Sequence, residues 1–434
     1  MEKKYTRLKF ACYSMNITMG AVGNLSPLLF LSFRSEYGLS YSLLGLLVLV
    51  NFCTQLTMDL IFSFFSHKFN MEKAVKSMPY IAIVGFLLYA LLPLAFPDFA
   101  YLGILLGTVI FSASSGFAEV LLSPVIAALP SENPEREMSK LHSVYAWGTV
   151  GVVVISTLYL FFVGSQYWHF LAMFFTLIPL AGAILFFGQK LPPLETPQKV
   201  EGVMEHLKKK EVWLCVFAIF LGGASECTMA QWCSGYVERA LALPKIWGDI
   251  FGVALFAATL GIGRSLYAKI GKNIEKVLLL GSLGATVCYL VAALVGLPIF
   301  GLIACAFTGF CVSMLWPGSL VVSAEKVPTG GVFMYAMMAA GGDLGASVGP
   351  QLVGVITDGV SASAWGGELS KTLGITAEQL GMKTGMLVGA LFPLVGVFVF
   401  LSFYLSKRKN AKKPLEQKYS LGARPKRARA NFNA

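Results

Sequence analysis

Twelve long apolar segments constrain this chain more than any other feature of its sequence. They lie near residues 10–33, 41–65, 77–96, 100–129, 140–163, 168–188, 212–236, 247–268, 276–297, 299–323, 332–357 and 384–406. A helix needs about 20 mainly apolar residues to cross the hydrocarbon layer of a membrane. Lipid offers no hydrogen-bond partners to an open strand. The sequence therefore predicts an all-α membrane protein with twelve transmembrane helices.

The composition agrees with a membrane protein. Hydrophobic residues make up 56% of the 434 residues and charged residues only 13%, whereas soluble domains carry about 25% charged residues. This excludes soluble enzymes and disordered chains. The sequence contains no Walker motif, nucleophile elbow or metal-ligand motif, and its eight cysteines lie in apolar runs without a C-x-x-C pair. We expect no enzymatic activity, no cofactor and no metal.

The positive charges predict the orientation in the membrane. With the N-terminus in the cytoplasm, the inner loops and termini carry 29 Lys and Arg residues and the outer loops carry five. Residues 407–434 alone contribute +9 of the net charge of +11. We expect this tail to lie against anionic lipids and not nucleic acid. The expected protein is a monomer in a bacterial plasma membrane, with both termini cytoplasmic.

Matching residues recur at a nearly constant distance along the chain. Residues 70–73 read NMEK and residues 273–276 read NIEK, and Gly116 and Pro124 recur as Gly309 and Pro317. The repeat predicts two pseudo-symmetric six-helix bundles. Their expected bounds are 1–188 and 212–406, with a cytoplasmic linker at 189–211 and the basic tail at 407–434.

This organisation resembles the major facilitator superfamily, in which two parallel halves enclose a substrate site near the middle of the membrane. Residues 263–272 resemble the loop motif of that superfamily in degenerate form, and residues 59–68 resemble it more loosely. The resemblance implies a secondary active transporter that works by alternating access.

Four acidic residues lie well inside the apolar segments. They are Asp59, Glu119, Glu226 and Asp343. A charged group at the centre of the bilayer costs about 2.5–3.5 kcal/mol on insertion scales. The sequence places no Lys or Arg at the same depth, since Arg264 lies near the end of its segment. We therefore expect the four acids to face a wet cavity, bind a cation or hold protons.

Residues 116–124, which read GFAEVLLSP, resemble the fucose–proton symporter family within the superfamily. Residues 142–148, 222–226 and 343–354 also fit the pattern of that family. The resemblance implies that Glu119 couples proton movement to transport. A hydrogen bond to a neighbouring helix and cation binding are the alternatives. The carbohydrate-binding symporter of the family has an aspartate in its first span, where this chain has Asn24. The repeat mate of Asn24 is Glu226, which becomes a second candidate for proton coupling.

Two of the three remaining acids have alternative expected roles. Glu226 is expected to bind substrate or to form a polar contact between helices. Asp343 lies among glycines that allow close helix packing, so gating or packing competes with substrate contact. We expect Asp59 to form an inner-gate ion pair with Arg264 or Lys269.

Polar and aromatic side chains at mid-depth are candidates for the substrate site, because sugars are bound by amides, carboxylates and aromatic rings. Together with Glu226, the candidates are Asn24, Gln55, His142, Trp147, Gln231, Trp232 and Trp316. Phosphate and carboxylate substrates are usually bound by Arg or Lys. The apparent lack of a deep base therefore favours a neutral or cationic substrate.

These observations predict a proton-coupled symporter of a small neutral polar solute such as a monosaccharide. Sodium could replace the proton as the coupling ion. The alternative is a proton-driven efflux carrier for amphipathic or cationic compounds, which the acids without basic partners would also serve.

Overall fold

The computed structural model describes residues 2–65, 68–130, 134–192, 207–270, 272–328 and 331–422, apart from some side chains within these ranges. In this part of the chain all regular structure is helical. The N-terminal bundle comprises α1 (Glu2–Tyr37), α2 (Tyr41–Phe65), α3 (Met71–Ala95), η2 (Pro97–Phe99), α4 (Ala100–Ala127), α5 (Pro134–Phe162), η3 (Ser165–Tyr167), α6 (Trp168–Phe175) and α7 (Leu177–Phe186). The C-terminal bundle comprises α9 (Lys210–Arg239), α10 (Lys245–Trp247), η4 (Gly248–Ala254), α11 (Leu255–Ile270), α12 (Ile274–Leu294), α13 (Pro298–Val312), α14 (Leu315–Lys326), α15 (Gly331–Ala362), α16 (Ala364–Leu373), α17 (Ala377–Gly389) and α18 (Leu391–Gly422).

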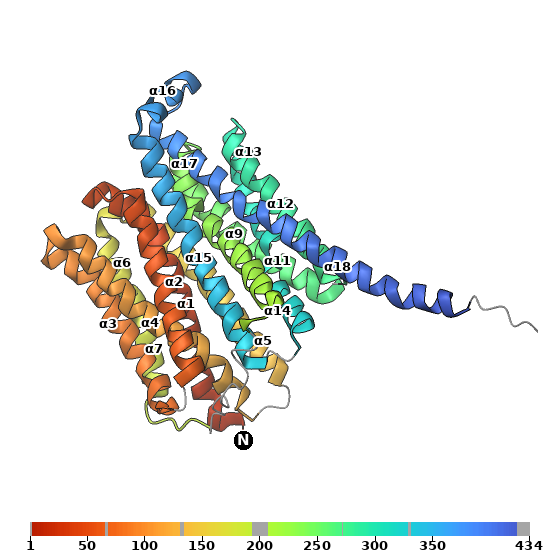
Figure 1. Ribbon diagram of the computed structural model, residues 1–434. Helices are drawn as coiled ribbons and strands as arrows, with labels where there is room; N and C mark the ends of the chain where they lie inside the picture. The colour runs from red at the N-terminus through yellow and green to blue at the C-terminus, as the bar shows by residue number, and fades with distance from the viewer. Residues whose placement is uncertain are drawn as a thin grey trace, which may run out of the picture.

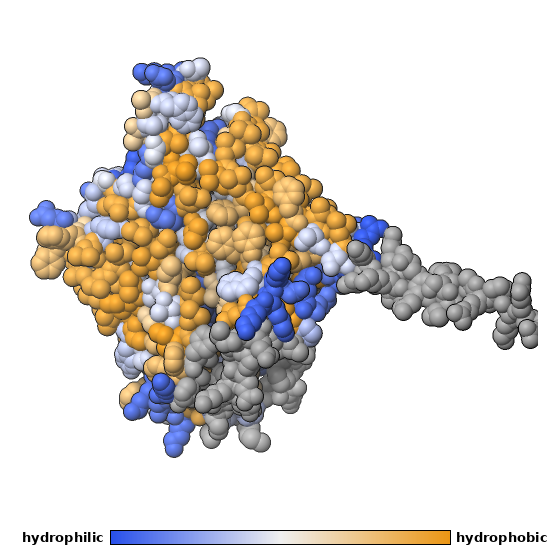
Figure 2. Space-filling view, in the orientation of Figure 1, coloured by the Kyte–Doolittle hydropathy of each residue, from blue (hydrophilic) through white to orange (hydrophobic). Residues whose placement is uncertain are grey.

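The predicted apolar segments are found as helices. Within the described residues, ten helical stretches are long and apolar enough to cross a membrane. The other two predicted segments, 10–33 and 332–357, lie in α1 and α15, whose polar and glycine residues reduce their apolarity. Hydrophobic residues cover the sides of the molecule, while hydrophilic residues gather toward its ends (Figure 2). The all-α membrane fold is confirmed.

Three segments that the sequence predicts as single helices are interrupted. The sixth segment divides into α6 and α7 at Thr176, the tenth divides into α13 and α14 near Ser313, and the twelfth divides into α17 and α18 at Ala390. The hydroxyl of Thr176 donates to the carbonyl of Met173 at 2.6 Å, and that of Ser313 donates to the carbonyl of Phe310 at 2.7 Å. Such bonds compete with the helical pattern of the backbone, although Ser77 makes the same kind of bond inside the unbroken α3.

The repeated NxEK sequences begin equivalent helices. Asn70 immediately precedes α3, and Asn273 immediately precedes α12. The Asn70 side chain accepts a hydrogen bond from the backbone of Lys73 at 3.0 Å and so caps α3. Glu72 and Glu275 lie in the first turns of the two helices, where the helix dipole favours negative charge.

The two bundles lie side by side, with α16 at the upper end of the molecule and the start of α1 at the lower end (Figure 1). Helices α2 and α15 make the most extensive contact between the bundles. A Cβ atom at Gly45 would lie 3.0 Å from the Cα of Gln351, and one at Gly354 would lie 2.3 Å from the carbonyl oxygen of Tyr41. The backbones of the two helices therefore touch. We call this contact the α2–α15 seam.

The predicted boundaries of the bundles stay a prediction. Residues 193–206 of the expected linker and 423–434 of the expected tail lie outside the described residues. At the other boundary, α18 does not end at the predicted residue 406 but continues to Gly422 (Figure 1).

Candidate functional site between the bundles

Three of the four predicted acids lie together at the interface of the bundles. Asp59 comes from α2, Glu119 from α4 and Asp343 from α15. The carboxyl groups of Asp59 and Asp343 interact with one another, and both interact electrostatically with Glu119. Asp59 and Asp343 are buried, whereas Glu119 is exposed. Among the described residues, none hydrogen-bonds to Asp59 Oδ1 or Asp343 Oδ2. We call these three residues the acidic triad.

The fourth acid pairs with a base that the sequence places elsewhere. Glu226, in the middle of α9, lies 3.4 Å from the guanidinium of Arg264 on α11. The expected Asp59–Arg264 pair is not formed, because Arg264 turns toward its own bundle while Asp59 meets Asp343 across the seam. The long arginine side chain reaches the level of Glu226. The expectation that no base lies at this depth is therefore wrong.

Side chains from both bundles enclose an open space. Tyr145 on α5 is close enough to interact electrostatically with Glu119, Glu226 and Arg264. These neighbouring groups do not bury one another. Tyr145 is 39% exposed, the Arg264 side chain is 45% exposed, and Glu119 is also exposed. Water therefore reaches the space between them. We call it the inter-bundle gap.

In the N-terminal bundle, the predicted substrate residues have mixed surroundings. Asn24 is half-buried and donates to the Gly20 carbonyl at 2.8 Å. Gln55 is buried and its amide is satisfied, since it donates to Asn51 at 3.2 Å and accepts from Ser115 at 3.0 Å.

Two further predicted residues lie on α5. Trp147 is 75% exposed. It follows Tyr145 by two positions, which puts the two side chains about 200° apart on the helix, so Trp147 points away from the inter-bundle gap. His142 also lies on α5, but its side chain lies outside the described residues.

In the C-terminal bundle, the predicted residues mainly pack between helices. Gln231 is buried and donates across the bundles to the carbonyl of Gly23 at 3.3 Å. Trp232 is buried and donates to the carbonyl of Pro350 at 2.8 Å. Trp316 fills a notch, because a Cβ at Gly342 would lie 2.4 Å from its Cη2 atom. The structure thus brings Glu119, Glu226 and Arg264 to the gap, and seats Trp232 and Trp316 in packed surroundings.

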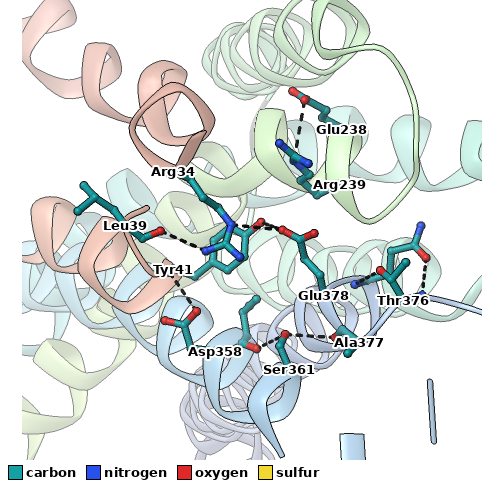
Figure 3. A network of polar contacts seen from close by, with 12 residues as sticks. Arg34, Leu39, Tyr41, Glu238, Arg239, Asp358, Ser361, Thr376, Ala377 and Glu378 are labelled. Atoms are coloured by element: carbon teal, nitrogen blue, oxygen red, sulfur yellow. Dashed lines mark hydrogen bonds and ion pairs between the residues drawn. The ribbon is translucent and has the colours of Figure 1, made fainter. Parts of the chain in front are cut away.

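Sequence reasoning missed a group of polar residues that joins the bundles at the upper end (Figure 3). Asp358 of α15 accepts hydrogen bonds from the backbone N–H groups of Tyr41 at 3.0 Å and Ser42 at 2.6 Å. Arg34 lies 3.4 Å from Glu378 of α17 and 4.1 Å from the centre of the Tyr41 ring. The Tyr41 hydroxyl donates to Glu378. We call Arg34, Tyr41, Asp358 and Glu378 the upper latch.

A second contact joins the bundles near the same end. The hydroxyl of Thr157 on α5 donates to Asp249 of η4 at 3.1 Å. Asp249 is buried, accepts a hydrogen bond from Ser234 and pairs with Lys245 at 2.8 Å. The carboxylate is therefore satisfied on both oxygens. Asp249 lies in the π-helical segment η4, and π-helical turns occur frequently at functional sites.

Ion pairs at the lower end stay within one bundle. Glu137 lies 2.7 Å from Lys140 and 3.1 Å from Lys9, all in the N-terminal bundle. Lys140 and then Lys9 hold the pKa of Glu137 below its usual value. Lys407 lies 2.7 Å from Glu275 in the C-terminal bundle. Among the described residues, the ion pair that joins the two bundles, Arg34–Glu378, lies at the upper end.

Among the described residues, no three His, Cys, Asp or Glu side chains lie close enough together to hold a metal ion, the acidic triad included. The site consists of acids, one arginine and one tyrosine, which can bind polar solutes and exchange protons.

A family model described as Major Facilitator Superfamily matches residues 11–350. Among curated proteins, none matches the sequence.

Three solved structures share the fold. A bacterial homologue of the human lysosomal transporter Spinster, in an inward-facing and occupied conformation, has a TM-score of 0.72 at 14% identity, covering 94% of this chain and 97% of that one. A D-xylose–proton symporter has a TM-score of 0.66 at 14% identity, covering 90% and 97%. The transporter FucP in its outward conformation has a TM-score of 0.59 at 18% identity, covering 92% and 99%.

Proposed function

The chain belongs to the major facilitator superfamily, and we propose that it is a proton-coupled symporter of a small polar solute of monosaccharide size. Members of this superfamily are transporters, so the chain is a multi-pass membrane transporter and not an enzyme. Alternating access between the two bundles would carry the solute through the inter-bundle gap.

The acidic triad supports proton coupling. Glu119 is exposed to the gap, while Asp59 and Asp343 are buried beside it. Like charges that close together disfavour full ionisation of all three groups. A proton shared by the triad relieves this repulsion, and Glu119 is the member that water can reach. The exposed position of Glu119 within electrostatic range of two buried acids is the observation that carries the proposal.

The orientation proposed here follows the positive charges. Lys9, Lys140 and Lys407 lie at the lower end, and cytoplasmic loops of membrane proteins are rich in Lys and Arg. The lower end would therefore face the cytoplasm of a bacterial plasma membrane. Protons would enter from the outside, reach Glu119 when the bundles are open at the upper end, and leave when they are open at the lower end.

Transport in proteoliposomes tests the coupling. The wild-type protein should accumulate at least one labelled solute from a panel of hexoses, deoxyhexoses, pentoses and hexuronates when a pH gradient is imposed. Glu119→Gln should abolish accumulation and retain exchange of the same solute. Glu72→Gln is the matched control, because Glu72 pairs with Lys76 at the surface. Full gradient-driven accumulation by Glu119→Gln would overturn the role of Glu119.

A second candidate, the export of amphipathic cations, is favoured by the same triad because three acids lie together at the interface. It predicts that tetraphenylphosphonium, and not sugars, raises the thermal stability of the purified protein. The sequence favours a neutral or cationic solute because it shows no deep Lys or Arg. Arg264 lies beside Glu226, so this argument against anionic solutes does not hold.

A further inference from the structure

Arg264 is held in place by its own bundle. Its Nε atom donates to the carbonyl oxygen of Ser313 at 3.1 Å, at the point where α13 ends. A Cβ at the preceding Gly263 would lie 2.3 Å from Ser313 Oγ, so α11 and α13 are in close contact here. The guanidinium is therefore positioned before any solute arrives.

The pair between Arg264 and Glu226 uses little of the binding capacity of the guanidinium. One nitrogen, Nη2, faces both carboxylate oxygens, at 3.4 and 3.5 Å. Strong Arg–carboxylate pairs use two nitrogens in parallel at about 2.7–2.9 Å. Among the described residues, none forms a hydrogen bond with Nη1 of Arg264, and the side chain is 45% exposed. The planar fork is therefore free to accept a better partner.

The surroundings leave room for such a partner on the gap side. Tyr145 and Glu119 of the other bundle lie within electrostatic range of one another, and Tyr145 within range of Arg264. The Arg264 side chain is 45% exposed and Tyr145 is 39% exposed, so protein atoms do not fill the space around them. A group bound to Arg264 would thus lie between the bundles, where the transported solute must pass.

We propose that Arg264 recognises the solute through a carboxylate, which takes the place of Glu226 on the guanidinium. This inference rests on the proposed transport function and narrows the solute to a small organic acid of monosaccharide size, such as a hexuronate. Displaced from Arg264, Glu226 loses its counter-ion and is stabilised by binding a proton. One carboxylate and one proton therefore enter together, and the net charge of the site does not change.

Binding measurements on the purified, full-length protein test this inference without a membrane gradient. The probes are two hexoses and the two hexuronates with the same rings, and the readouts are thermal stabilisation and proton uptake on binding. We expect the wild-type protein to bind a hexuronate, with proton uptake, and to bind its parent hexose at least about tenfold more weakly.

Two variants that break the same ion pair separate recognition from a structural role. Arg264→Gln should weaken hexuronate binding at least about tenfold. Glu226→Gln should strengthen hexuronate binding and abolish the accompanying proton uptake, because it removes the competing carboxylate. A pair that only holds α9 and α11 together predicts equal effects of both variants.

Several results would overturn the inference. These are equal binding of hexose and hexuronate, hexuronate binding that survives Arg264→Gln, weaker binding by Glu226→Gln, or no stabilisation by either hexuronate. Gradient-driven uptake of a hexose that is insensitive to Arg264→Gln would overturn this inference and leave the proposed symport intact. Arg264-dependent hexuronate binding without gradient-driven accumulation would contradict the symport instead.

Discussion

The carboxylate of Asp358 caps a helix that belongs to the other bundle. It accepts from the backbone N–H of Tyr41 at 3.0 Å and from the next N–H of α2 at 2.6 Å. The first N–H groups of a helix lack partners within the helix, and the positive end of the helix dipole favours a negative charge there. The cap therefore exists only while the upper ends of the bundles are together.

Removing this cap should loosen the upper end. We expect Asp358→Ala to destabilise the closed arrangement of the upper ends by about 1 kcal/mol. The amides of residues 41 and 42 should then exchange hydrogen about fivefold faster. The measurement is hydrogen–deuterium exchange with peptide resolution. Ser40→Ala is the matched control, because Ser40 caps the Leu43 amide at 3.2 Å within the same bundle. Equal exchange in Asp358→Ala and wild type would show that the cap does not hold the ends together.

Adding one methyl group to the α2–α15 seam should be costly. Gly354→Ala places a Cβ 2.3 Å from the carbonyl oxygen of Tyr41, and backbone atoms cannot yield as a flexible side chain does. We expect a loss of about 1–3 kcal/mol in the free energy of unfolding, measured by denaturant titration in detergent. The control is Gly359→Ala on the same helix, where a Cβ meets nothing within 4 Å and alanine favours the helix. Similar losses in both variants would contradict the close contact.

The buried pair of Asp249 and Lys245 should contribute more to stability than the bond that Asp249 makes across the interface. Asp249→Ala removes the hydrogen bonds of Lys245 to a charged partner, and because Lys245 is half-buried we expect a cost of about 1.5–3 kcal/mol. Thr157→Val removes one hydrogen bond and should cost about 1 kcal/mol. Thermal unfolding of the two variants measures the difference. If Asp249→Ala reduced the thermal stability no more than Thr157→Val, the ion pair would contribute as little as an ion pair fully exposed to water.

Protonation of Glu137 in acid should reduce the stability of the folded protein, because it breaks the ion pairs of Glu137 at the lower end. The two lysines lower the pKa of Glu137 in the folded protein from its usual 4.5. A lowered pKa means that the folded state favours the ionised form. The contribution is therefore complete above pH 4.5 and is lost as the pH falls through the lower, folded-state pKa. Thermal unfolding as a function of pH should show a shallower acid loss for Glu137→Gln than for wild type. An unchanged acid slope would mean that other groups control this loss.

The helices could be predicted from the sequence because a membrane imposes a length and an apolar composition on each of them. The acids could also be recognised, since a charge inside an apolar segment is conspicuous. That Asp59, Glu119 and Asp343 would meet was not predictable, because their contact depends on how α2, α4 and α15 are rotated about their axes. The repeat placed equivalent residues in each half and did not give these rotations.

Arg264 shows why depth along the sequence is a poor measure of depth in the membrane. Its Cα lies near the end of its segment, but the flexible stem carries the guanidinium to Glu226. The upper latch was missed for another reason. Tyr41 and Asp358 are 317 residues apart and both lie at the edges of apolar segments, where charged residues are ordinary. The two residues come into contact only because the upper ends of the two bundles meet in the folded protein.

The α2–α15 seam has a mechanical consequence. Helices α2 and α15 share the most extensive contact between the bundles, and their backbones touch at Gly45 and at Gly354. Two helices in such close contact cannot separate at one end without losing the contacts made there. They can roll against each other. The seam therefore defines the axis about which the bundles can turn, so substitutions along it should alter the rate of turnover more than the affinity for the solute.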